Sequence, residues 1–167
     1  DNFCTKTFPN EYFDIQKRSR VKSAKEIFHS ISEFFLCKDE PVKASDARHA
    51  VIVFIGHGSE AGFQVYDGGV IDLNEIIVHV WKCWSTCKKK FKSEKGILPK
   101  MVQIIFTQCY GHTYDQTDCD NMEIHRLTSE GQCLSMSRLD ENNKFYIVGL
   151  ETVAAKIRNT MRKLGNE

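Results

Sequence analysis

Two continuous apolar runs constrain the fold of this chain more than any other feature of its sequence. AVIVFI occupies residues 50–55 and MVQIIFT occupies residues 101–107. Runs of this kind, without alternating polar residues, are typical of strands that are buried on both faces of a parallel sheet. Parallel strands need a long crossover between them, which is usually a helix. The two runs therefore predict an α/β fold, with residues 50–55 as a central strand.

Two amphipathic segments supply helices for such a fold. The first is VKSAKEIFHSISEFF, and the second spans residues 73–90 after Asp72, which together with Glu75 resembles a capping box. The inward stripe of the first segment consists of Val21, Ala24, Phe28, Ile31 and Phe35. The inward stripe of the second consists of Leu73, Ile76, Ile77, Val80, Trp81 and Trp84. Both tryptophans are therefore predicted to lie in the core.

The remaining regular segments are shorter. FQVY is followed by DGGVI, in which Asp67 and Gly68 are typical turn residues, and the two segments predict a small hairpin. KFYIVGL at residues 144–150 predicts a third strand, and VAAKIRNTMRKLG predicts a closing helix. Strands alternating with helices indicate a three-layer sandwich, in which a largely parallel sheet carries helices on both faces. A length of 167 residues with 41% hydrophobic content fits one domain over residues 1–167.

Charge and hydropathy exclude two classes of partner. Lys and Arg total 23 against 22 Asp and Glu, a formal net charge of +1, so no global field would recruit nucleic acid. No apolar run approaches the roughly 20 residues that a membrane-spanning helix needs. The first residues, DNFCTKTFPN, lack the basic and apolar regions of a signal peptide. The sequence therefore predicts neither nucleic-acid binding nor a membrane span in this chain.

The seven cysteines allow two interpretations of the compartment. In an oxidising compartment six could pair and one would remain as a reactive thiol, for which Cys109 is the best placed. In the cytoplasm all seven would be scattered, reduced thiols. We predict a secreted protein, or one in the lumen of the endomembrane system or lysosome, with Cys109 free and the other six cysteines paired. A cytoplasmic location is the alternative.

Both apolar strands lead into residues with reactive side chains. AVIVFI continues through Gly56 into His57 and Gly58, and MVQIIFT continues through Gln108 into Cys109. Parallel neighbours bring their carboxyl ends to one edge of the sheet, where ligands bind in such folds. A thiol becomes a nucleophile beside a base, and a histidine can later protonate a leaving amine. The pattern predicts a His57/Cys109 dyad. Taken alone, His57 would fit an ordinary polar turn, and Cys109 would fit a small buried hydrophobic residue at a strand end.

Two backbone groups complete this candidate site. Gly58 has no Cβ, so its N–H can approach a substrate carbonyl and, with the N–H of Cys109, form an oxyanion hole. This chemistry needs no metal and no cofactor. Cys83 and Cys87 could sketch a zinc site with Cys119, His112 or His125, but their spacing is not the C-x₂-C of ordinary zinc knuckles. Disulfides or packed thiols are the preferred interpretation of these two cysteines.

The order of these segments resembles the caspase-like cysteine peptidases. GHGSEAGF, the hairpin leading to DLNEI, and KMVQIIFTQCYG carry the resemblance within residues 50–111. Legumains are the most similar, with a strand ending HGS-x-G, a D-L-N-E helix start, and K-M before a strand ending in cysteine. The glycosylphosphatidylinositol transamidase subunit is similar too. The resemblance implies a caspase-like fold, with His57 as general acid/base, Cys109 as nucleophile, and Gly58 and Cys109 as oxyanion donors.

The chain also departs from this family. Legumains have an acidic residue where this chain has Gly56, and an acidic residue and a serine where it has Tyr110 and Gly111. The family has a strand ahead of the first helix, and residues 1–18 offer no candidate for it. Two hypotheses follow: a cysteine endopeptidase or transpeptidase acting on peptides or proteins, and an inactive caspase-like binding or regulatory module. An incomplete sheet edge would also allow homo- or hetero-oligomers.

Overall fold

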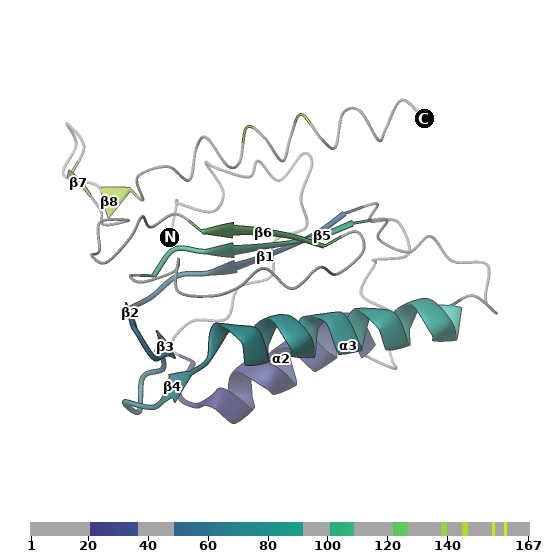
Figure 1. Ribbon diagram of the computed structural model, residues 1–167, viewed down its shortest axis with the longest axis horizontal. Helices are drawn as coiled ribbons and strands as arrows, with labels where there is room; N and C mark the ends of the chain where they lie inside the picture. The colour runs from purple at the N-terminus through teal and green to yellow at the C-terminus, as the bar shows by residue number, and fades with distance from the viewer. Residues whose placement is uncertain are drawn as a thin grey trace.

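The computed structural model describes residues 21–36, 49–91, 101–108, 122–126, 138–139 and 145–146, together with Ala155 and Asn159. Within these residues, two long helices, α2 (Ala24–Leu36) and α3 (Leu73–Phe91), lie side by side on one face of a three-stranded sheet (Figure 1). The α/β content and the parallel sheet predicted from the sequence are confirmed. None of the described helices is long and apolar enough to cross a membrane.

The sheet contains β1 (His49–Phe54), β5 (Met101–Phe106) and β6 (Met122–Arg126) in the order β1-β5-β6, and all pairs are parallel. Five residues of β5 have no exposed surface, namely Val102, Gln103, Ile104, Ile105 and Phe106. In β1, by contrast, only Ala50 and Phe54 are buried among the residues whose side chains are described. Within the described sheet, β5 is therefore the middle strand, and a central place for β1 stays a prediction.

The third strand of this sheet is β6, which the sequence analysis did not predict. Its segment MEIHR alternates apolar and polar residues, and Met122 and Ile124 join the core on the side of the helices. The predicted third strand, at residues 144–150, is described only as β8 (Phe145–Tyr146). It pairs antiparallel with β7 (Arg138–Leu139) in a separate two-stranded sheet. The prediction that this segment supplies the third strand of the parallel sheet is thus wrong for its described part.

Each long helix begins at a capping residue. Ser23 precedes α2, and its Oγ accepts a hydrogen bond from the N–H of Glu26, 3.3 Å away. Asp72 precedes α3, and its Oδ1 accepts a hydrogen bond from the N–H of Asn74 at 2.7 Å. Both bonds satisfy N–H groups that the first turn of a helix leaves without an internal partner. The start of α3 after Asp72 is confirmed.

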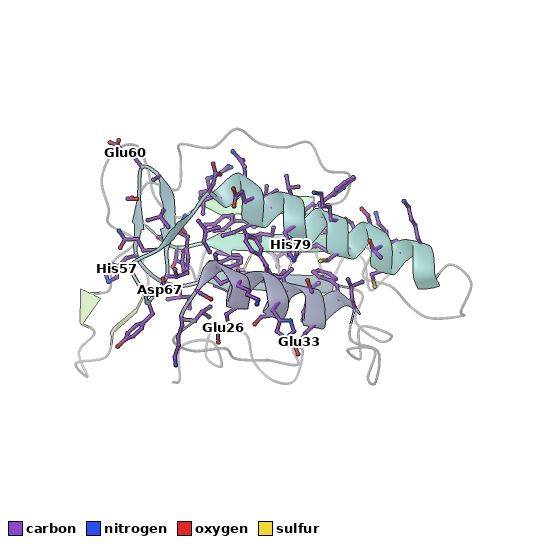
Figure 2. All side chains as sticks on the ribbon, turned by 90° about the horizontal axis from the view of Figure 1, so that it is seen from below. Glu26, Glu33, His57, Glu60, Asp67 and His79 are labelled. Atoms are coloured by element: carbon purple, nitrogen blue, oxygen red, sulfur yellow. The ribbon has the colours of Figure 1, made fainter. Side chains whose placement is uncertain are left out.

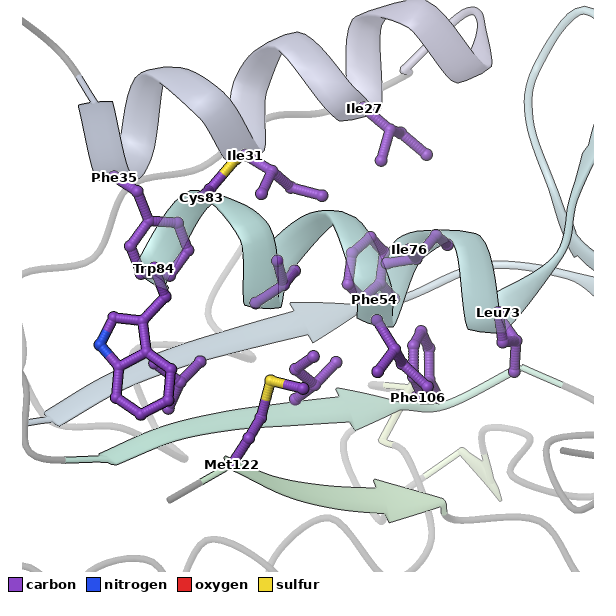
Figure 3. Packing of buried hydrophobic residues seen from close by; sticks show 14 of the residues in the cluster. Ile27, Ile31, Phe35, Phe54, Leu73, Ile76, Cys83, Trp84, Phe106 and Met122 are labelled. Atoms are coloured by element: carbon purple, nitrogen blue, oxygen red, sulfur yellow. The ribbon is translucent and has the colours of Figure 1, made fainter. Parts of the chain in front are cut away.

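The core lies between the two helices and the sheet (Figure 3). Phe54 and Phe106 stack at the ends of β1 and β5 with ring centroids 5.2 Å apart, and Trp84 of α3 is 1% exposed. Trp81, which was predicted to lie in the core, is 41% exposed. At 3.6 residues per turn it falls roughly a quarter turn from the centre of the buried stripe, so it lies at the margin of the helix face.

A small antiparallel sheet connects β1 to α3. It contains β2 (Gly58–Ser59), β3 (Gly62–Gln64) and β4 (Val70–Ile71) in that order. The turn between β3 and β4 contains Gly68 with a φ of 87°, as the sequence predicts for this hairpin. The sequence analysis did not anticipate β2, which directly follows His57.

Two further predictions are only partly covered. Ala155 and Asn159 have helical backbone, and the rest of the predicted closing helix lies outside the described residues, as do residues 1–18. A second helical layer on the other face of the sheet therefore stays a prediction. Cys83 is buried and forms no disulfide with any residue that the structure describes, and the predicted pairing of the six cysteines other than Cys109 stays a prediction.

Candidate functional site at the carboxyl edge of the sheet

The carboxyl ends of β1 and β5 lie at the same level. Phe54 is the register partner of Phe106, and the N–H of Thr107 donates to the carbonyl of Phe54 at 3.1 Å. The hydroxyl of Thr107 donates to the same carbonyl at 2.9 Å. These bonds hold the two strand ends together just before their connecting loops begin, which is where ligands bind in parallel α/β sheets.

His57 is exposed and comes three residues after Phe54. Its carbonyl accepts a hydrogen bond from the N–H of Gln64 at 2.9 Å, so the backbone that carries the imidazole is anchored to β3. Figure 2 shows His57 beside the small antiparallel sheet, away from His79, which lies between the helices. The imidazole of His57 is therefore exposed at this edge of the sheet, on a backbone held in place by β3, and is accessible to a ligand there.

Gly58 has a backbone N–H that points away from its partner strand. Gly58 pairs with Phe63, and the bond from Gln64 to the carbonyl of His57 marks this as a non-hydrogen-bonded pair of the antiparallel ladder. In such a pair both residues direct their N–H groups outward. The geometry therefore leaves this donor available for an acceptor outside the hairpin.

The glycine before the histidine is explained by packing. A Cβ added at Gly56 would lie 2.9 Å from Cζ of Phe63, which is itself 7% exposed and part of the core. An acidic side chain here would have to displace that ring. Gly56 is therefore explained by the packing of Phe63 against Phe54, whose ring centroids are 5.7 Å apart.

Cys109 is the next residue after Gln108 and lies outside the described residues, as do His112 and Cys119. Of the predicted site residues, the structure therefore describes His57 and Gly58, and it brings both to the carboxyl edge. That Cys109 lies close to these two residues stays a prediction. The oxyanion role of its N–H likewise stays a prediction.

Two polar residues at this edge were missed by the sequence analysis. Gln108 is 1% exposed, and neither its Nε2 nor its Oε1 has a hydrogen-bond partner among the residues that the structure describes. Arg126 is the register partner of Phe106, and its Nε and Nη2 are buried without a hydrogen-bond partner in the described part of the chain. Burial lowers the pKa of the Arg126 guanidinium below its usual value. Buried polar groups are rarely left without partners, and functional sites are one place where they occur.

The described residues do not support the zinc site sketched from Cys83, Cys87 and His125. His125 lies on β6, where its Nε2 is 3.4 Å from Oε2 of Glu123, whereas both cysteines are buried on α3. Among the described parts of the chain, no group of three or more His, Cys, Asp or Glu side chains converges. For Cys83 and Cys87, packed thiols are the interpretation that fits their burial.

Comparisons with protein-family models, with curated proteins and with solved structures found no match to this chain. The caspase-like resemblance thus depends on the residues of this sequence alone, and it enters below as a proposal.

Proposed function

We propose that this chain is a cysteine endopeptidase or transpeptidase of the caspase-like group, with His57 and Cys109 as its catalytic pair. The observation that carries the proposal is the pairing of β1 with β5. His57 comes three residues after Phe54, Cys109 comes three residues after Phe106, and Phe54 and Phe106 are register partners. Two segments that leave a sheet from the same level favour an encounter between the residues at equal distance along them.

In the proposed reaction, the thiolate of Cys109 attacks the carbonyl carbon of a peptide bond. The N–H groups of Gly58 and Cys109 stabilise the negative oxygen that forms. The C–N bond then breaks, and the imidazolium of His57 gives its proton to the leaving amine. The thioester is resolved by water in an endopeptidase, or by a second amine in a transpeptidase, and His57 takes the proton from that nucleophile.

The polar groups around this edge support a peptide or protein as the ligand. A peptide presents carbonyl acceptors and N–H donors, and the unpartnered amide of Gln108 can serve as both partner types. The outward N–H of Gly58 is a further donor. We also propose that the chain can form an oligomer through the outer edge of β1. The proposed location in an oxidising lumen belongs to the same proposal, and both depend on residues outside the described ranges.

Thiol labelling and peptide cleavage test the dyad directly. We expect a limiting amount of iodoacetamide to label the native chain mainly at Cys109 by mass spectrometry. His57→Ala should slow this labelling at least tenfold, because the thiolate loses its base. His29→Ala is the matched control, since His29 is an exposed histidine on α2 that pairs only with Glu33 of its own helix in the described contacts.

Cleavage of a peptide library gives the second measurement. We expect hydrolysis by the native chain and by His29→Ala, and none by Cys109→Ala or His57→Ala. If Cys109 is labelled at the same rate in the native chain and in His57→Ala, the proposed dyad is wrong. Fast labelling of Cys109 without hydrolysis or amine transfer of any library member would instead favour the inactive binding or regulatory module.

A further inference from the structure

The connection between β1 and α3, residues 55–72, has an exposed surface that the proposed reaction does not use. Among the residues that the structure describes, the exposed large apolar or aromatic side chains are Ile55, Tyr66, Val70 and Trp81. All of them except Trp81 belong to this connection. With His57 counted as neutral, its charged residues are all acidic: Glu60, Asp67 and Asp72. Its formal charge is therefore −3 within a chain of +1.

Strand pairing brings the exposed side chains of this connection to the face that also carries His57. Gln64 is the register partner of Val70, and its N–H donates to the carbonyl of His57 at 2.9 Å. Residues directly opposite each other in an antiparallel ladder share a face, and so do residues two apart along a strand. Tyr66, two residues after Gln64, therefore shares this face, and all four side chains are exposed. The alternate residues are buried: Phe63, Val65 and Ile71.

Hydrogen bonds hold the backbone that presents these side chains. The N–H of Val65 donates to the carbonyl of Gly69 at 2.9 Å, and the N–H of Tyr66 donates to the carbonyl of Val21 at 3.2 Å. Oδ1 of Asp67 accepts a bond from the N–H of Gly69 at 2.9 Å. A carboxylate has two acceptor oxygens, so Oδ2 can accept a further bond from a ligand. We call the exposed side chains of Gln64, Tyr66, Asp67 and Val70 the hairpin face.

A long basic side chain fits this combination of groups. Lys and Arg have an apolar stem that packs on apolar surface and a charged head that stays in water. On the hairpin face, Val70 offers apolar surface for the stem, the ring of Tyr66 attracts a cation, and the carboxylate of Asp67 accepts charged hydrogen bonds. Lys22, whose carbonyl accepts a bond from the N–H of Asp67 at 3.1 Å, weakens the negative potential on one side. Glu60 and Asp72 strengthen it.

We propose that the hairpin face binds a Lys or Arg side chain of the peptide that His57 and Cys109 act on. The inference rests on the proposed function, because it names a residue that the substrate carries. Neighbouring strands lie about 4.8 Å apart, so Val70 is two strand spacings, or roughly 10 Å, from the backbone of His57. An extended peptide rises about 3.3 Å per residue, which puts the basic residue about three residues from the bond that is cut.

Peptide binding to the full chain with Cys109→Ala tests this face without cleavage. The probe is a fluorescent peptide that repeats Gly-Ser-Arg, so that an arginine recurs at every third position, and the reference peptide has Glu in place of Arg. We expect fluorescence anisotropy to show binding of the arginine peptide and no measurable binding of the glutamate peptide. Asp67→Asn and Tyr66→Ser should each weaken binding about threefold, because exposed ion pairs and exposed cation–π contacts are both modest.

Two variants outside the hairpin face are the matched controls. Glu33→Gln removes the same charge as Asp67→Asn, but from α2, and Figure 2 shows Glu33 away from His57. Trp81→Ser removes an exposed aromatic ring from α3. Both should bind the arginine peptide as tightly as the Cys109→Ala chain. The proposal is wrong if the arginine peptide does not bind, if both peptides bind equally, or if a control loses as much affinity as its matched variant.

Cleavage by the native chain separates this inference from the proposed function. Among the cleaved members of a peptide library, we expect Lys or Arg to be enriched about three residues from the cut, and Tyr66→Ser to reduce this enrichment. Cleavage without the enrichment would contradict the inference and leave the dyad in place. If Asp67→Asn weakens binding of the arginine peptide but the native chain cleaves no peptide, the hairpin face is supported and the peptidase is not.

Discussion

At the scale of single residues, Gly62 tolerates a side chain least among the glycines whose surroundings the structure describes. Its φ is 136°, and an added Cβ would lie 2.0 Å from the carbonyl oxygen of Ile71, a backbone atom held in the β3–β4 ladder. We expect Gly62→Ala to lower the free energy of unfolding by about 3 kcal/mol, because strain and a steric clash add. Urea denaturation monitored by circular dichroism measures this loss.

Gly68 provides the matched control for that substitution. Its φ of 87° is also positive, but no atom lies within 4 Å of an added Cβ. Gly68→Ala should therefore cost only about 1 kcal/mol, which is the price of the backbone conformation alone. Losses of the same size at both glycines would show that the contact with Ile71 has no energetic effect.

At this scale, the sequence predicts where a residue lies when its position along the chain determines its place, and it does not predict burial or hydrogen bonding that depends on neighbours in space. His57 could be placed at the sheet edge because it follows a buried strand. Trp81 and Trp84 share one residue type and one helix, and only packing separates the exposed ring from the buried one. The unpartnered groups of Gln108 and Arg126 likewise depend on what surrounds them in space, which no local pattern encodes.

At the scale of elements, the cap of α3 should have a measurable energetic effect. Asp72→Ala removes the acceptor for the N–H of Asn74, and we expect a loss of about 1 kcal/mol in the free energy of unfolding. Asp72→Asn keeps an acceptor at the same place and should lose less. Urea titrations of both variants compare them. Equal losses would assign the effect to the charge of Asp72 near the helix N-terminus rather than to its hydrogen bond.

Element prediction depended on the length and strength of each pattern. The runs that became β1 and β5 and the stripes that became α2 and α3 span enough residues to determine their type. The strand β6 has only five residues, MEIHR, of which Met122 is buried and the other four are partly exposed. Its apolar members, Met122 and Ile124, are too few to distinguish it from a polar loop. Because β6 was not predicted, the strand order of the sheet was not predicted either.

At the scale of the whole molecule, the sheet edge combines anchored backbone with unsatisfied polar groups. The pairing of Phe54 with Phe106 joins the two strand ends, and the hairpin positions His57 and Gly58 next to them. The general location of a site could be predicted from the parallel topology. Its polar lining could not, because Arg126 reaches the edge only through the pairing of β6 with β5.

Arg126 should therefore lower the stability of the molecule that contains it. Partial burial disfavours the charged guanidinium, as its lowered pKa indicates, and within the described residues Nε and Nη2 form no hydrogen bonds that would offset the loss of water. Arg126→Met keeps much of the side-chain volume and removes the charge. We expect a gain of about 1 kcal/mol in the free energy of unfolding, or roughly 2–4 °C in Tm. The control is Arg126→Lys, which keeps a charge and should give no gain. A Tm of Arg126→Met below that of the native chain would mean that the guanidinium stabilises the fold. Arg126 would then no longer count as an unsatisfied polar group at the carboxyl edge of the sheet.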